Sequence, residues 1–129
     1  MKKLLVTGGK GMVGSAIDSS IKLGREYNLI NPEETLKAFT DHKPTHVIHC
    51  AGKVGGVGGN MNYKGEYFYD NLMINTNVIE SARKTGVKHL VAFLSTCVFP
   101  DNVEYPLTSN QVHLGEPHSS NYPYAYAKR

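Results

Sequence analysis

The chain has 129 residues, enough for one domain with a hydrophobic core. Its 40% hydrophobic and 19% charged residues are typical of a globular protein, and the net charge of +3 includes no Lys or Arg run that would follow a nucleic acid backbone. No apolar stretch is long enough to cross a membrane, and the one after Met1 is too short for a secretory signal. We therefore expect a cytoplasmic protein without nucleic acid or membrane partners, whose two cysteines are thiols.

The six histidines do not form a metal-binding pattern. His46 and His49 are three apart in a strand-like run, and this spacing sends side chains to opposite faces. His113 and His118 lie in a Pro/Gly/Ser-rich segment without carboxylate or cysteine neighbours. We predict no metal site.

A glycine-rich turn follows the first apolar run. Residues 3–7 predict a buried strand, and Ser15 begins a helix. Between them the sequence fits both G-x-G-x-x-G and G-x-x-G-x-x-G. Such glycines let the backbone approach a pyrophosphate, whose charge the following helix amino terminus stabilises. The candidate cofactor-binding residues here are Gly8, Gly9, Lys10, Gly11, Met12, Val13 and Gly14.

The segment after this turn leaves little room for a second strand. A helix from Ser15 to Leu23 is followed at once by Gly24, although a dinucleotide fold needs a strand ending in a residue that chooses NAD or NADP. Arg25 is suited to a 2′-phosphate and Glu26 to a ribose hydroxyl, and the sequence leaves both open, as it does for Lys10. The candidates for this part of the cofactor are Arg25, Asn28 and Leu29.

The middle of the chain continues as helix, strand and loop. Asn31 is a helix cap followed by Pro32, and that helix extends to about Asp41. Residues 45–50 predict a strand whose small following residues leave space for a dinucleotide. Residues 53–60 predict a mobile glycine-rich loop. Three residues at this point join the candidate cofactor site: Ala51, Gly52 and Lys53.

A long helix and another buried strand follow. The helix runs from about Tyr67 to Lys84 and stops at Gly86. Residues 87–94 predict the strand, and residues 101–123 a long irregular connection. A core stripe is predicted on the helix, formed by Leu72, Ile79 and Ala82 with Ile74 and Val78.

The alternation of strands and helices predicts an α/β fold: a Rossmann-like, doubly wound parallel sheet with a shortened second strand. Ser95 and Cys97 come directly after the last strand, at the sheet edge where such folds bind ligands. Tyr124 and Lys128 are one helical turn apart, so an ammonium faces a phenol and favours its ionised form.

Together these motifs resemble the extended short-chain dehydrogenase/reductases. The resemblance rests on the glycine turn, Ser95, Tyr124-x-x-x-Lys128, the Lys53-Val54-Gly55-Gly56 loop, and Cys97 within Ser-Thr-Cys-Val-Phe-Pro. Within that family, it implies an NADPH-dependent enzyme that epimerises C3 and C5 and reduces C4 of GDP-4-keto-6-deoxy-mannose, commonly as a homodimer. Related dehydratases have an acid where Cys97 stands.

The resemblance also implies roles for four catalytic residues. Cys97 is the base that removes the protons next to the ketone, and Tyr124 protonates the alkoxide while Ser95 holds its oxygen. Lys128 binds the nicotinamide ribose and lowers the pKa of Tyr124.

The family's chains continue beyond the position of Arg129, into the substrate domain and a histidine that assists epimerisation. The resemblance thus implies that residues 1–129 are the amino-terminal part of an NAD(P)-binding domain, with little or no turnover alone. Two alternatives remain: another nucleotide-sugar epimerase or dehydratase of this superfamily, and a non-catalytic nucleotide-binding remnant.

Overall fold

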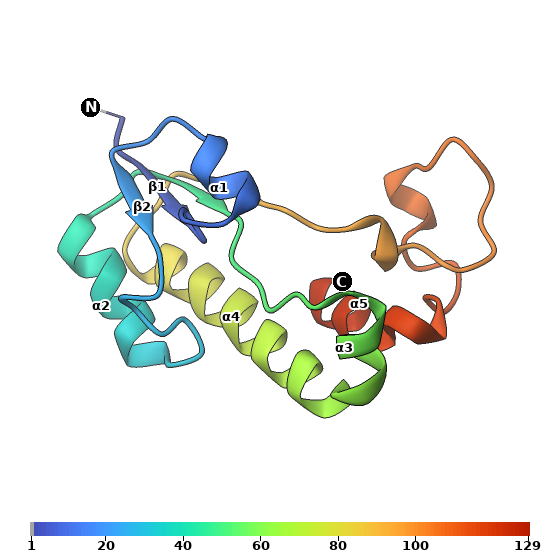
Figure 1. Cartoon of the computed structure of the whole chain (residues 1–129). Helices are drawn as coiled ribbons and strands as arrows, with labels where there is room; N and C mark the ends of the chain where they lie inside the picture. Colours follow the sequence, from blue (N-terminus) through green and yellow to red (C-terminus); the bar gives the residue numbers. More distant parts are fainter. Residues whose placement is uncertain (1) are drawn as a thin grey trace. The chain divides into compact units, whose positions relative to one another are not determined.

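The computed structural model describes residues 2–129, and its strands form one parallel sheet in the order β2-β1-β3-β4 (Figure 1). The elements in chain order are β1 (Leu4–Thr7), α1 (Met12–Ala16), β2 (Ile21–Leu23), α2 (Pro32–His42), β3 (His46–His49), α3 (Gly56–Asn62), α4 (Lys64–Lys84), β4 (His89–Ala92) and α5 (Tyr122–Lys128). The expected Rossmann-like α/β class is confirmed.

The chain divides into two compact units. Unit 1 contains the residues up to Gly52 and residues 73–93, which include the whole sheet. Unit 2 contains residues 53–72 and 94–129, with α3, the first part of α4, and α5.

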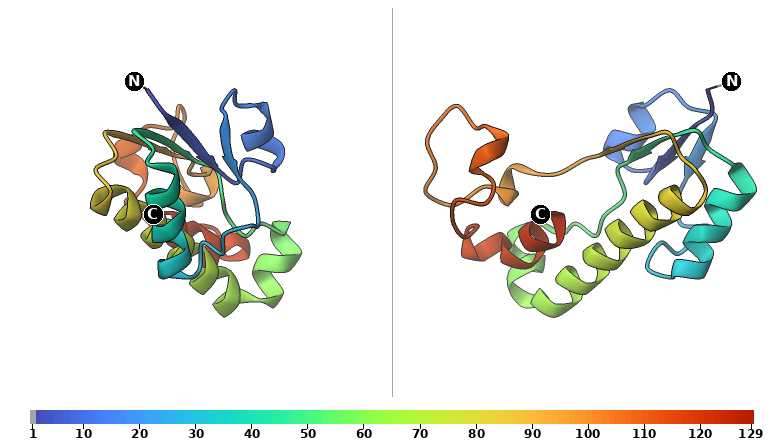
Figure 2. Two further views of the ribbon diagram at one scale, coloured as in Figure 1. Left: turned by 90° about the vertical axis from the view of Figure 1, so that its left-hand side faces the viewer. Right: turned by 180° about the vertical axis from the view of Figure 1, so that it is seen from behind.

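The hydrophobic core of unit 1 lies between the sheet and two helices. Helix α2 and the second part of α4 cover the same face of the sheet (Figure 2). Asn31 caps α2 as predicted, because its Oδ1 accepts hydrogen bonds from the backbone N–H groups of Glu33 and Glu34. The buried core residues are Leu5, Leu23, Leu29, Ala38, Phe39, Val47, Ile74, Val78 and Ala82.

The second strand begins earlier than predicted. Helix α1 ends at Ala16, and residues 21–23, which we had assigned to the helix, form β2. Leu5 pairs with Ile21 in the parallel register. The hydroxyl of Ser19 donates to the carbonyl of Leu4 over 2.7 Å. Pairing with β1 therefore overrides the helical pattern, and the second strand is present but has only three residues, in agreement with the predicted shortened strand.

The predicted mobile loop at residues 53–60 is wrong in its second half, which forms α3. Glycines disfavour a helix by themselves, but here they allow close packing. A Cβ added to Gly55 or Gly59 would lie 1.9 or 2.4 Å from the Tyr67 hydroxyl oxygen. Tyr67 is buried and thus packs directly against the backbone of α3.

The predicted core stripe of α4 is partly wrong. Ile74, Val78 and Ala82 are buried, whereas Leu72 is 39% and Ile79 53% exposed. The buried stripe follows the spacing of four residues from Ile74, and the other two residues lie outside it. The helix itself and its stop at Gly86, whose φ is +74°, are confirmed.

Strand β4 is not the buried strand we expected. It lies at the end of the strand order, and Val91 is 58% exposed. Leu90, which pairs with Val47, packs on the core, so the exposed residue points to the opposite face.

The long connection after β4 is irregular, as predicted, with three short 3₁₀ turns at Thr96–Val98, Ser109–Gln111 and Ser119–Asn121. Among the helices within residues 2–129, none has the length and apolar character needed to cross a lipid bilayer.

Candidate active site

The glycine turn of unit 1 is built for close backbone contacts. Gly8 has a φ of +65°, and a Cβ there would lie 2.8 Å from the backbone nitrogen of Ala51. At Gly14, a Cβ would lie 2.3 Å from the carbonyl oxygen of Gly8. Helix α1 can therefore pack on the turn only with a glycine at this position. Met12 and Val13 are exposed beside it.

Lys10 reaches from this turn to the loop after β2. Its Nζ lies 3.0 Å from Oε2 of Glu26, whose Oε1 accepts a hydrogen bond from the backbone of Gly24. That backbone hydrogen bond, helped by Lys10, lowers the pKa of Glu26 to about 2. A cation and an anion thus meet where a dinucleotide fold distinguishes NAD from NADP, and exposed Arg25 directly precedes Glu26 in the sequence.

The remaining candidate cofactor residues of unit 1 lie in the core or form backbone hydrogen bonds. Leu29 is buried in the core, so its side chain is structural. The backbone N–H of Asn28 donates to Glu34. The backbone N–H of Ala51 donates to the Thr7 hydroxyl oxygen over 3.3 Å, and Gly52 follows it at the end of this segment.

Lys53, in unit 2, is held by two groups of contacts. Its backbone N–H donates to Oδ1 of Asn71 over 2.8 Å, and its carbonyl accepts from Nδ2 of the same side chain over 3.0 Å. Its Nζ forms ion pairs with Asp70 and Glu66, which raise the pKa of the lysine. The ammonium is therefore engaged within unit 2.

Cys97 and Tyr124, both in unit 2, line one cavity of about 210 Å³. Cys97 also lines a second cavity of about 370 Å³, together with His118 and Asn121. The backbone N–H of Cys97 donates to the Ser95 hydroxyl over 3.2 Å, which makes Ser95 the cap of the first 3₁₀ turn. The thiol and the phenol, which are distant in the sequence, are brought together by the fold.

Lys128 is buried one turn after Tyr124, with its Nζ 5.8 Å from the centroid of the Tyr124 ring. Burial raises the pKa of Tyr124, and the neighbouring Cys97 raises it further. The expectation that Lys128 brings this pKa down is therefore not met in the structure. The ammonium lies against the ring face, where its attraction is to the π system.

Two lining residues escaped the sequence analysis. Asn60 and Asn121 line the smaller cavity together with Val54, Gly55 and Gly56. Asn121 comes directly before the Tyr-x-x-x-Lys helix and was available as a signal, because this position lies close in sequence to Tyr124, which lines the same cavity. Nothing in a glycine-rich stretch predicts that Asn60 is buried.

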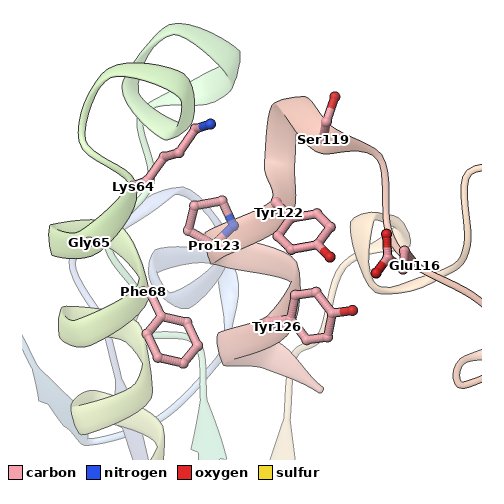
Figure 3. A pocket seen from close by; sticks show the side chains of 8 residues that line it. All are labelled: Lys64, Gly65, Phe68, Glu116, Ser119, Tyr122, Pro123 and Tyr126. Atoms are coloured by element: carbon pink, nitrogen blue, oxygen red, sulfur yellow. The ribbon is translucent and has the colours of Figure 1, made fainter.

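A larger hollow of about 770 Å³ lies between the start of α4 and α5 (Figure 3). Tyr122 and Tyr126 form one wall, with ring centroids 4.7 Å apart, and Phe68 lies opposite. Hydrogen bonds involving Tyr126 and Glu116 raise the pKa of Tyr122 to about 12. Within residues 2–129, no three His, Cys, Asp or Glu side chains are grouped to hold a metal ion.

A parallel sheet with a glycine turn after its first strand, together with a Tyr-x-x-x-Lys helix, defines a Rossmann-like dinucleotide-binding protein. The family model for the NAD dependent epimerase/dehydratase family matches residues 4–129, and the chain belongs to that family.

Similar proteins include a probable GDP-L-fucose synthase of Drosophila melanogaster, 45% identical over all of this chain and 44% of the relative. The GDP-L-fucose synthase of Dictyostelium discoideum is 43% identical over 99% of this chain and 44% of its own length. Among solved structures, a GDP-L-fucose synthetase of Naegleria fowleri bound to NADP is 41% identical. It has a TM-score of 0.89 and matches 99% of this chain and 42% of that structure. The chain thus spans less than half the length of these relatives.

Proposed function

We propose that residues 1–129 form the amino-terminal, cofactor-binding part of an NADPH-dependent epimerase-reductase that converts GDP-4-keto-6-deoxy-mannose to GDP-L-fucose. The observation that carries this proposal is the cavity shared by the Cys97 thiol and the Tyr124 phenol. The similarity to GDP-L-fucose synthases over the whole chain supports the choice of substrate.

The glycine turn fits a dinucleotide pyrophosphate. Glycines stand where the pyrophosphate must approach the backbone, and a Cβ at Gly8 or Gly14 would collide with backbone atoms. Lys10 and Arg25 supply positive charge for a 2′-phosphate, which favours NADPH over NADH. Lys128 is assigned to the nicotinamide ribose.

Reduction needs a proton donor at the sugar's C4 oxygen. Bound NADPH supplies the hydride that adds to C4. The Tyr124 hydroxyl donates its proton to the oxygen as negative charge develops there, and Ser95 is assigned a hydrogen bond to that oxygen. The raised pKa of Tyr124 keeps the phenol protonated at neutral pH, so it is ready to act as an acid.

Epimerisation needs a base beside C3 and C5, whose hydrogens the C4 carbonyl makes acidic. A thiol has an ordinary pKa of about 8.5 and needs only modest help to act as a thiolate. We assign the base to Cys97, which removes the proton and leaves an enolate. A proton returned to the opposite face inverts the carbon. Epimerisation depends on the C4 ketone, so it must precede the reduction of C4.

We further propose a homodimer that works in the cytoplasm. Two apolar side chains in the part of α4 that belongs to unit 2 are at least 39% exposed: Phe68 and Leu72. They recur at helical spacing and would be covered by the same helix of a second copy. Two thiols without a disulfide suit a reducing compartment. Sedimentation of wild type and Leu72→Lys tests the pairing, since a charge there should shift a dimer toward monomer.

The activity can be tested by joining residues 1–129 to the portion of the Drosophila relative that follows its matched region. We expect this fusion to consume NADPH and convert the keto-sugar to GDP-L-fucose. Titration of the 129-residue chain with NADPH, followed by nicotinamide fluorescence, tests cofactor binding separately. If the chain binds NADPH but the fusion leaves the keto-sugar unchanged, the chain is a non-catalytic nucleotide-binding protein.

A further inference from the structure

Asn60 has a buried amide oxygen without a hydrogen-bond partner in residues 2–129. The residue is only 4% exposed, and its Nδ2 donates to the Gly56 carbonyl over 2.9 Å. That bond fixes the orientation of the amide, because the reversed amide would bring two acceptors together. Buried acceptors are nearly always satisfied, so this one needs an explanation.

The unsatisfied residue belongs to the wall of the cavity that contains Cys97 and Tyr124. No lining residue of this cavity carries a formal charge, and its polar groups are a thiol, a phenol and two side-chain amides. Such a lining suits a neutral ligand with hydroxyl groups, whose O–H would be a donor for the Asn60 oxygen.

The position of Asn60 is set in advance by packing. Gly55, the cap before α3, and Gly59, within the helix, both lie against Tyr67, so that a Cβ at either position would collide with the Tyr67 hydroxyl oxygen. Tyr67 is itself buried on α4. The amide is therefore held by a supported helix, as expected of a binding residue that must not rearrange.

Resting on the proposed function, we infer that Asn60 is a substrate-binding residue. Its Oδ1 accepts a hydrogen bond from a hydroxyl group of the hexose while Cys97 and Tyr124 act on the ring. The substrate has two free ring hydroxyls, at C2 and C3, because C4 is a ketone and C6 a methyl group. The hydrogen bond would orient the ring, and it contributes no proton transfer.

The test compares Asn60→Leu with Asn62→Leu in the fusion to the Drosophila relative. Asn62 is on the same helix and exposed, so it is a matched control. Asn60→Leu should raise the KM for the keto-sugar by about tenfold, as expected for one lost hydrogen bond at a buried site. The kcat of reduction and the affinity for NADPH should change little. Asn60→Ala, which adds no bulk, guards against misfolding.

Substrate analogues lacking the C2 or the C3 hydroxyl complete the test. One of the two analogues lacks the hydroxyl that Asn60 binds, and its KM with the wild-type fusion should be higher than that of the keto-sugar. Asn60→Leu should not raise the KM of this analogue further. An unchanged KM in both Asn60 variants would overturn the inference, and would mean that only water satisfies the amide. A wild-type fusion that binds NADPH but leaves the keto-sugar unreacted would instead refute the proposed function.

Discussion

The ammonium nitrogen of Lys128 lies 5.8 Å from the ring centroid of Tyr124, against the face of the ring. The phenol beside it is half-buried and adjacent to Cys97, and both surroundings raise its pKa. In this arrangement Tyr124 stays protonated through neutral pH. The phenol therefore holds the proton that the proposed reduction requires it to donate to a developing alkoxide.

Tyr124→Phe in the fusion should remove this donor. We expect NADPH oxidation by the keto-sugar to fall by about 10²–10⁴-fold, the usual contribution of a general acid. Exchange of the C3 and C5 hydrogens with solvent deuterium should persist, because it does not need the phenol. Tyr126→Phe, on the same helix, serves as control and should retain reduction.

Cys97→Ser should have the opposite effect. A serine hydroxyl is a far weaker base than a thiol, so deuterium exchange at C3 and C5 should fall by about 10²-fold or more. Reduction of the keto-sugar without epimerisation should remain measurable by NADPH oxidation. Equal loss of exchange and reduction in both variants would contradict the separate roles assigned to Cys97 and Tyr124.

The sequence predicted those parts of the fold and of the site that depend on local spacing. The glycine turn, the cap at Asn31 and the one-turn separation of Tyr124 and Lys128 are each contained within a few residues. The cavity shared by Cys97 and Tyr124 was harder to predict from the sequence, because it forms only where the 3₁₀ turn at Thr96–Val98 meets α5.

The errors arose where tertiary contacts outweigh local preference. The pairing of β2 with β1 shortened α1, and packing on Tyr67 turned a glycine-rich stretch into α3. The helical spacing of apolar residues assigned Leu72 to a core stripe, although the helix exposes it. The same contacts hid Asn60, since its burial depends on α3 being a helix.

Gly14→Ala tests the glycine turn. The added Cβ would lie 2.3 Å from the Gly8 carbonyl oxygen, a backbone atom that cannot move without distorting the turn. We expect NADPH affinity of the 129-residue chain to fall by about tenfold or more, measured by nicotinamide fluorescence. Gly65→Ala is the control: nothing lies within 4 Å of its Cβ position in helix α4. It should leave NADPH binding unchanged and stabilise the chain by about 0.4–1 kcal/mol.

Glu26 should make the stability of the chain depend on pH in acid. Its pKa is lowered from 4.5 to about 2, chiefly by the hydrogen bond from the Gly24 backbone and with help from Lys10. A lowered pKa in the folded state means that the carboxylate stabilises the fold above its unfolded pKa, and that this contribution is lost as pH falls toward 2. Urea unfolding of wild type and Glu26→Gln should differ at neutral pH and converge in that acid range. Lys10→Met should keep most of the pH dependence of stability, because the backbone hydrogen bond is the larger cause of the lowered pKa. If the pH dependence disappears completely in Lys10→Met, the ion pair is its cause instead.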